Sequence, residues 1–196
     1  MRLISGAAFG GLLAIACAAP VTAQTSSTSP LYINLDAGAS MYNTKISGLT
    51  DHFDTGWGID GRIGHHMNNA FRTELEFGYE SANTNQSGMK GRLSNFDIMA
   101  NGILDIPTQS SFTPYIGVGA GGARIEADVT APPIPRFDDA GWTFAYQGLA
   151  GADWHLAPRT TLGVRYRYLD AQPVHLAGFK TDHNSGLASA NLKFTF

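Results

Sequence analysis

Cysteine is almost missing from this sequence of 196 residues, and charged residues are scarce. The only cysteine is Cys17, and Asp, Glu, Lys and Arg together make up 15% of the chain. A single cysteine excludes a disulfide framework within the chain. The formal net charge of −3 at pH 7 gives no sign of the basic surface that nucleic acids require, so we expect no nucleic-acid partner.

Long apolar runs are also missing beyond the N-terminus. After residue 23 no apolar run approaches the roughly 20 residues that a membrane helix needs. Glycine and aromatic residues are plentiful instead: 23 glycines are spread over the chain, and Phe, Trp and Tyr reach 11%. Few charges with many aromatics and glycines favour a β-protein whose surface does not lie entirely in water.

The N-terminus indicates a secretory signal peptide. Arg2 precedes an apolar stretch from Leu3 to Ala19, and the small residues Val21, Thr22 and Ala23 follow as a cleavage site. Cleavage after Ala23 removes Cys17, so the mature chain has no thiol chemistry. We therefore expect a signal peptide at 1–23, a short flexible segment at 24–30 and one barrel domain at 31–196.

Two alternatives remain for this N-terminal segment. A transmembrane helix is disfavoured because the apolar run has only about 17 residues and no basic stop-transfer flank. A lipoprotein signal would acylate Cys17, but residues 14–16 lack the leucine that such signals usually place three residues before the cysteine.

Apolar and polar residues alternate with a period of two through the rest of the chain. In the last segment Leu192 and Phe194 point one way, while Asn191 and Lys193 point the other. The same split recurs in seven earlier segments separated by turn residues, which is typical of a membrane barrel. The pattern predicts an all-β fold: an eight-stranded antiparallel up-and-down transmembrane β-barrel.

In one predicted strand, Pro114 to Glu126, the alternation is not clear. Glycines at 117, 119, 121 and 122 blur its parity and permit a β-bulge.

The connections between predicted strands alternate between short and long. The short ones have about four to six residues and the long ones about 11 to 15; the short ones are 67–70, 107–112 and 157–160, and the long ones are 42–55, 81–91, 127–140 and 170–184. Short turns of such barrels face the periplasm and long loops face the exterior. Aromatic residues flank both sets and predict two interfacial belts: Trp57, Tyr79, Trp142 and Tyr168 beside the long loops, and Phe71, Trp154, Phe194 and Phe196 beside the short turns.

The chain resembles the opacity-type, OmpA-like outer-membrane β-barrel family, often labelled porin family, in three segments and at its last residue. These are TPYIGVGAGGA at 113–123, YQGLAGADW at 146–154, VRYRY at 164–168 and Phe196. The resemblance implies the bacterial outer membrane as location and its lipid as surroundings. It also implies that Phe196 and the strand before it are the signal for the outer-membrane assembly machinery. The motifs are specific for the fold and not for a role.

An eight-stranded barrel has an interior just wide enough for side chains to fill it, so we expect no wide aqueous channel. Alternation places five basic and six acidic residues in this lumen: Arg62, Arg72, Arg165, Arg167 and Lys193, with Asp36, Asp60, Glu74, Glu76, Asp97 and Asp153. Charges away from bulk water need partners. We interpret the set as a structural ion-pair network that closes the barrel. The alternative is a charge-gated narrow pore, in which Arg or Lys exchanges carboxylate partners.

Candidate catalytic and metal sites are weak. His183 and Ser185 resemble the base and nucleophile of the lipid A deacylases, but alternation points both of them inward rather than to lipid. His65 and His66 are adjacent on a strand and face opposite sides, so they cannot chelate a metal as a pair. We expect no enzyme activity, no metal and no cofactor.

The sequence leaves three functions open. The leading hypothesis is a non-enzymatic, monomeric barrel that supports envelope integrity and contacts host or surface ligands through its four long loops. The third of these loops contains the proline-rich stretch from Ala131 to Pro135. The alternatives are a narrow passive pore for ions or small solutes, and a lipocalin-like soluble barrel that binds an apolar ligand.

Overall fold

The computed structural model describes residues 31–46, 49–52, 55–86, 89–131, 134–176 and 179–196. These residues form nine strands. They are β1 (Leu31–Ile46), β2 (Leu49–His52), β3 (Gly56–His66), β4 (Phe71–Gln86), β5 (Met89–Asp105), β6 (Phe112–Ala131), β7 (Ile134–Ala157), β8 (Thr160–Leu176) and β9 (Phe179–Thr195). Within the described ranges no helix is long and apolar enough to cross a membrane.

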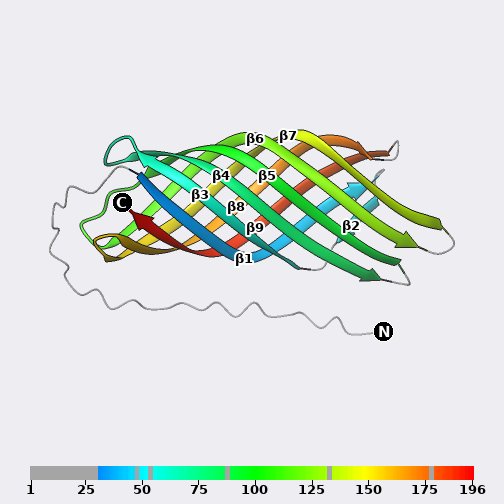
Figure 1. The fold of residues 1–196 in the computed structure, drawn as a ribbon, viewed down its shortest axis with the longest axis horizontal. Coiled ribbons are helices and arrows are strands. Elements are labelled where there is room, and N and C mark those ends of the chain that lie inside the picture. The colour runs from blue at the N-terminus through cyan, green and yellow to red at the C-terminus, as the bar shows by residue number, and fades with distance from the viewer. Residues whose placement is uncertain (1–30, 47–48, 53–54, 87–88, 132–133, 177–178) are drawn as a thin grey trace, which may run out of the picture.

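Eight of these strands close into an antiparallel barrel, as predicted. Each strand from β3 to β9 pairs with its neighbour in chain order, and β1 pairs with both β3 and β9. The short β2 pairs with the end of β1, outside the ring. Figure 1 shows the start of β1 and the end of β9 at the same end of the cylinder.

Alternation sets which side chains face outward. Along β4, Phe71, Leu75 and Phe77 are exposed, whereas Arg72 and Glu74 between them are buried. The other strands repeat this pattern, so the outside of the barrel is apolar and much of the inside is charged. Because charged groups lose their hydration inside while apolar groups stay outside, the arrangement suits a lipid surrounding rather than water.

The glycine-rich strand β6, whose parity the sequence left open, contains no bulge in its glycine segment. Its register with β5 runs unbroken from Tyr115 to Thr130, and its only shift against β7 lies between Val129 and Ala131. The alternating glycines 117, 119 and 121 share the inward parity of the buried Tyr115 and Ala123, and added Cβ atoms there would collide with neighbouring strands. At Gly121 a Cβ would lie 2.0 Å from the backbone oxygen of Ile98. These glycines let β5 approach β6 closely.

The prediction of four long loops is wrong for most of their length. Strands β4 and β5 pair as far as Gln86 and Met89, and β8 and β9 pair as far as Leu176 and Phe179. The β6–β7 hairpin likewise extends to Ala131 and Ile134, within the proline-rich stretch. The connections are hairpin extensions of the barrel strands, which Figure 1 shows at the end opposite the short turns.

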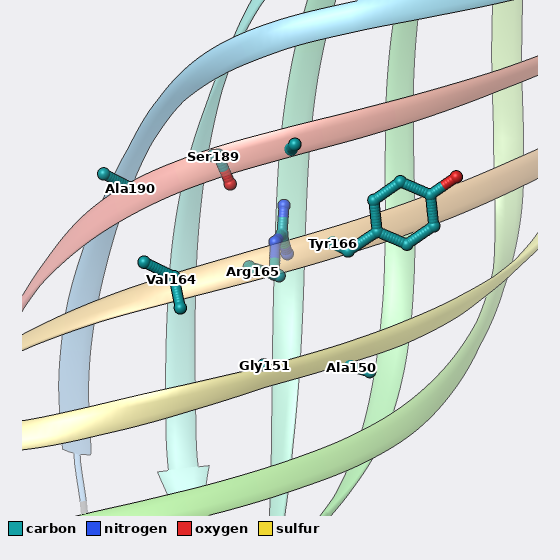
Figure 2. A pocket seen from close by; sticks show the side chains of 8 residues that line it. Ala150, Gly151, Val164, Arg165, Tyr166, Ser189 and Ala190 are labelled. Carbon is teal, nitrogen blue, oxygen red and sulfur yellow. The ribbon is translucent and has the colours of Figure 1, made fainter. Parts of the chain in front are cut away.

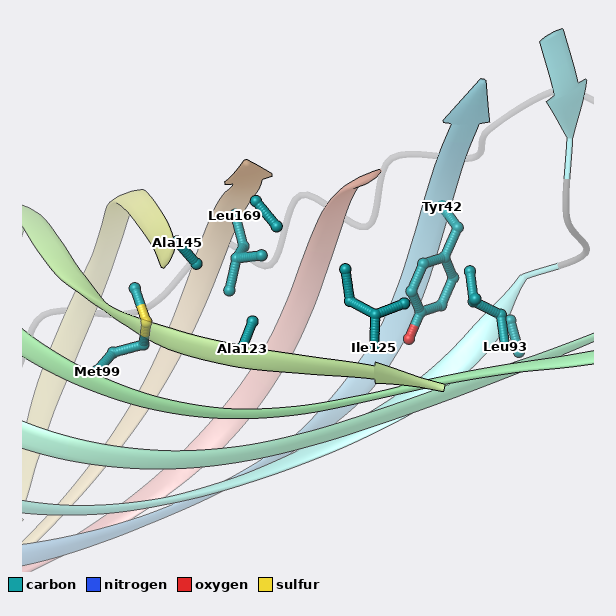
Figure 3. Close-up of a cluster of buried hydrophobic side chains, with 9 residues drawn as sticks. Tyr42, Leu93, Met99, Ala123, Ile125, Ala145 and Leu169 are labelled. Atoms are coloured by element: carbon teal, nitrogen blue, oxygen red, sulfur yellow. The ribbon is translucent and has the colours of Figure 1, made fainter. Parts of the chain in front are cut away.

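The interior is not polar throughout. In the half nearer the hairpins, a cluster of apolar side chains fills the lumen: Tyr42, Ala82, Leu93, Met99, Ala123, Ile125, Ala145, Leu169 and Ala171. Figure 3 shows these side chains converging from several strands. A smaller group of Ile103, Tyr115 and Leu149 lies elsewhere in the barrel. The charged residues therefore share the lumen with apolar layers.

Candidate functional site

Arg167 is the cation with the most carboxylate neighbours in the lumen. Its Nη1 donates to Glu76 Oε1 at 2.7 Å and to Asp97 Oδ1 at 3.0 Å, and its Nη2 donates to Glu80. Asp60 Oδ1 lies 3.6 Å from Nη1. The side chains are fully buried, so this guanidinium satisfies carboxylates that water cannot reach.

Arg165 and Arg62 continue the network along the barrel. Arg165 pairs with Asp60 and donates to Glu76 Oε2 at 2.7 Å. Arg62 donates to Asp36 Oδ2 at 2.8 Å and to Glu74 Oε2 at 2.9 Å. Asp36 also lies 3.4 Å from Arg165 Nε, so one carboxylate links the two guanidinium groups.

Neutral side chains add hydrogen bonds to the network. Asn101 Nδ2 donates to Glu76 Oε2 at 2.9 Å, and Gln147 Nε2 donates to Asn101 Oδ1 at 2.7 Å. The Tyr32 hydroxyl donates to Glu74 Oε1 at 2.6 Å. These amides and hydroxyls supply donors to carboxylates that already carry ion pairs, as buried charges require.

Arg72 and Lys193 form a second group at the end with the short turns. Arg72 Nη1 donates to Asp153 Oδ2 at 3.2 Å, and Lys193 pairs with the same carboxylate. Asp105 Oδ1 lies 3.3 Å from Arg72 Nε. The guanidinium of Arg72 stacks over the Tyr115 ring at 4.6 Å. This group joins the rest of the lumen through Glu74, 4.0 Å from Arg72.

The structure brings all eleven predicted lumen residues together and adds two that the prediction left out. Glu80 and Asp105 are buried and pair with Arg167 and Arg72. Both could have been found, because Asp105 shares the parity of Asn101 and Glu80 that of Glu76. The described lumen thus holds eight carboxylates against five basic side chains.

The outer face carries the aromatic residues that the belts require. Trp57 and Tyr79 pack with ring centroids 5.6 Å apart near the hairpins. Phe112 and Trp154 pack at 5.0 Å near the short turns. Between these levels lies a shallow apolar hollow of about 620 Å³ on β7, β8 and β9, lined by small residues beside Val164 and Tyr166 (Figure 2).

Among the side chains that the structure describes, the candidate catalytic and metal residues do not assemble into a site. Ser185 is buried, and its Oγ donates to Glu80 Oε1 at 3.2 Å, while the His183 side chain lies outside the described part. His66 packs against the Tyr32 ring at 5.0 Å. Within the described ranges, no group of three or more His, Cys, Asp or Glu residues could hold a metal ion.

Phe196 lies at the end of the barrel wall. The residue is 61% exposed, and its backbone N–H donates to the Leu31 carbonyl oxygen at 3.2 Å. The last residue therefore remains tied to the first strand while its ring stays accessible.

A protein-family comparison agrees with this geometry. Residues 9–196 match the outer membrane protein beta-barrel domain family. The chain belongs to this family. It is therefore a protein of the bacterial outer membrane, and the lipocalin-like alternative is wrong.

The individual proteins that resemble this chain share less than a third of its aligned residues. An uncharacterized protein of Brucella abortus is 28% identical over 140 residues, which is 55% of this chain and 49% of the relative. The chain thus spans about half the length of the curated relatives it matches. Among solved structures, Neisserial surface protein A superposes with a TM-score of 0.61 at 21% identity, covering 87% of this chain and all of that one. The outer membrane protease OmpT of Escherichia coli gives 0.54 at 10% identity, with 88% and 99% covered. These likenesses show the fold alone.

Proposed function

We propose that this protein is a closed, non-enzymatic barrel that supports the outer membrane and contacts other molecules through its outer hairpins. One observation carries the proposal. Glu76 on β4, reached across the lumen by Arg165 and Arg167 of β8, sits within a layer of buried charged side chains that occupies the lumen. An eight-stranded barrel filled in this way has no room for a wide channel.

A catalytic role has little support from the described side chains. The serine that resembled a nucleophile, Ser185, donates its hydrogen bond to a buried carboxylate inside the barrel. A hydroxyl in that place cannot reach a lipid substrate, and the likeness to a protease is one of fold. We therefore assign the function of this protein to its outer surfaces rather than to a catalytic site.

Two surfaces are available for that action. The apolar outer wall contacts membrane lipid, and the hairpins β4–β5, β6–β7 and β8–β9 extend from one end of the barrel. A paired hairpin keeps its backbone groups satisfied and so presents its side chains on a stable frame. We assign contact with host or surface ligands to these hairpins, recognition by the assembly machinery to Phe196, and a monomeric state to the protein.

Planar-bilayer recording of the purified protein tests the closed lumen against the pore alternative. We expect no reproducible conductance steps from the unmodified protein. The double variant Arg165→Ala, Arg167→Ala, if it folds, is expected to show steps because it empties the middle of the lumen. Regular steps from the unmodified protein would establish the pore function and remove the closed-lumen proposal.

A further inference from the structure

The charges buried in the lumen do not balance. The described lumen holds eight carboxylates and five basic side chains, and every one of these residues is buried. A charge without a partner in such a place loses its hydration and gains nothing in return, so it is strongly disfavoured. The excess negative charge therefore needs a counter-charge inside the barrel.

The excess lies in the middle of the lumen. The end with the short turns is balanced, because two basic and two acidic residues pair there around a polar cavity of about 250 Å³: Arg72, Lys193, Asp105 and Asp153. In the middle, three arginines face six carboxylates: Arg62, Arg165 and Arg167, with Asp36, Asp60, Glu74, Glu76, Glu80 and Asp97. The counter-charge is needed in this middle layer.

Glu80 and Asp97 in this layer share a single cation. Each forms an ion pair with Arg167 and with no other basic group among the side chains that the structure describes. Arg167 also serves other carboxylates, because its Nη1 lies 2.7 Å from Glu76 Oε1 and 3.6 Å from Asp60 Oδ1. Those two carboxylates have a second arginine partner, whereas Glu80 and Asp97 have none.

The remaining neighbours of the pair supply hydrogen bonds but no positive charge. Ser185 on β9 donates to Glu80 Oε1 at 3.2 Å. Asn95 on β5 donates to Asp97 Oδ2 at 3.1 Å. Tyr42 on β1 is a titratable group that faces Glu80 from the apolar cluster, and a tyrosine is neutral at physiological pH. One guanidinium is thus the only positive charge that these two carboxylates contact in the described lumen.

A proton is the counter-charge that this arrangement admits. Two carboxylates held by one guanidinium repel each other when both are ionised, and carboxylates that share a site in this way share a proton. The proton needs no space in a packed lumen, and it converts one carboxyl group from an acceptor into a hydrogen-bond donor. A metal ion needs several ligands, and within the described ranges no group of three or more such side chains could hold one.

We propose that Glu80 and Asp97 hold at least one proton between them at neutral pH, which makes the lumen a proton-binding site. A carboxylic acid in the unfolded chain ionises at about pH 4, so the proton is taken up when the barrel folds. Folding and proton binding are then linked, and the barrel loses stability as the pH rises. This property belongs to the lumen, so it does not depend on the outer hairpins or their ligands.

Infrared spectroscopy of the purified, folded protein at neutral pH tests the proposal directly. A protonated carboxyl group has a C=O stretching band that an ionised carboxylate lacks, and the band shifts when the protein is folded in D₂O. We expect this band in the unmodified protein, held in a detergent without carboxyl or ester groups. Absence of the band would overturn the proposal, whatever the behaviour of any variant.

Matched amide variants locate the proton. Asp97→Asn and Glu80→Gln each remove one negative charge and leave a single carboxylate to pair with Arg167. Each variant should therefore weaken the band by the intensity of one carboxyl group, whereas Asp153→Asn, at the balanced end, should leave it unchanged. A band that keeps its full intensity in both Asp97→Asn and Glu80→Gln would place the proton on other groups and overturn the assignment.

The pH dependence of unfolding gives an independent measurement. The equilibrium constant for urea unfolding is determined from about pH 5 to about pH 8 for the unmodified protein and for Asp97→Asn, because the histidines titrate in both and cancel in the ratio. We expect the ratio of the unmodified protein to the variant to rise with pH, by up to about tenfold per pH unit, since only the unmodified protein releases this proton on unfolding. A ratio that stays constant over this range would overturn the proposal.

Discussion

At the scale of single residues, Arg167 shows why the lumen charges depend on one another. It meets carboxylates from three strands: Asp60 on β3, Glu76 and Glu80 on β4, and Asp97 on β5. Taking these groups out of water costs free energy that their mutual attraction offsets only while every partner is present. Loss of the cation leaves several buried negative groups facing each other.

Arg167→Met should therefore lower the free energy of unfolding by about 3 to 5 kcal/mol, the usual cost of breaking a buried ion pair from one side. The midpoint of urea unfolding in detergent, followed by tryptophan fluorescence, measures the change. Arg124→Met is the matched control, because the Arg124 side chain is 47% exposed and pairs only loosely with Glu126 at 3.9 Å. Equal midpoints for the two variants would contradict the role given to the network.

Alternation could predict which side chains enter the lumen, but not which ones meet. The inward side of Arg165 follows from its place between Val164 and Tyr166. Its pairing with Asp60 does not, because the two residues are separated by 105 positions and lie on strands that are not neighbours. The partners depend on strand tilt and register, which local sequence does not report. For the same reason the polar cavity around Arg72 could not be foreseen.

At the scale of strands, two glycines show how closely the wall is packed in some places and how open it is in others. A Cβ added at Gly38 would lie 2.0 Å from the backbone oxygen of Ala188, where β1 meets β9. A Cβ added at Gly148 on β7 would meet nothing within 4 Å. The seam that closes the ring thus depends on a residue without a side chain.

Gly38→Ala should weaken the barrel while Gly148→Ala should not. The first change forces two backbones apart at the closing seam, and the second adds a methyl group to an open outer surface. We expect Gly38→Ala to lower the unfolding midpoint clearly and Gly148→Ala to alter stability by no more than about 0.5 kcal/mol. Heating the folded protein in detergent and following loss of its fast-migrating gel band provides the measurement. A stable Gly38→Ala barrel would show that the seam tolerates a side chain.

The outer hairpins are where prediction from sequence failed at this scale. Inside the membrane one strand face meets lipid and the other meets the lumen, so polarity alternates. Beyond the membrane both faces meet water, and the alternation ends although backbone pairing continues, as from Asp128–Asp138 to Ala131–Ile134. A loss of periodicity therefore does not by itself indicate a loop in a barrel of this kind.

Shortening the β6–β7 hairpin should leave the barrel intact. Replacing residues 128–138 with Asn-Gly joins the paired residues Ala127 and Asp139 through a two-residue turn that suits antiparallel strands. We expect the same gel shift and an unfolding midpoint within a few degrees of the unmodified protein. A chain that no longer inserts into detergent micelles would show that the hairpin contributes to folding and is not only a surface feature.

At the scale of the whole molecule, the two ends of the lumen differ. Apolar side chains such as Leu93, Ile125 and Leu169 fill the half nearer the hairpins (Figure 3). A polar cavity of about 250 Å³, lined in part by Thr113, lies at the end with the short turns. Water can enter the polar end, whereas the apolar cluster gives water few hydrogen-bond partners.

Thiol labelling should detect this difference. In a Cys17→Ser background, we expect Thr113→Cys to react readily with a charged, water-soluble thiol reagent and Ala123→Cys, which lies in the apolar cluster, to react at least about tenfold more slowly because a buried thiol is poorly accessible. Mass spectrometry of the folded protein over time gives both rates, and labelling after denaturation confirms that each thiol is intact. Similar labelling rates at the two positions would contradict the conclusion that the apolar cluster keeps water out of the half of the lumen nearer the hairpins.

The pairing of Arg165 with Asp60 also bears on how the molecule enters its membrane. The two residues come from β8 and β3, so neither can find the other while the strands still form an open ribbon. An incomplete sheet would turn bare charges toward hydrocarbon, where they are strongly disfavoured. Insertion should accordingly be all-or-none: lipid can surround the chain only once its last strand has docked on its first.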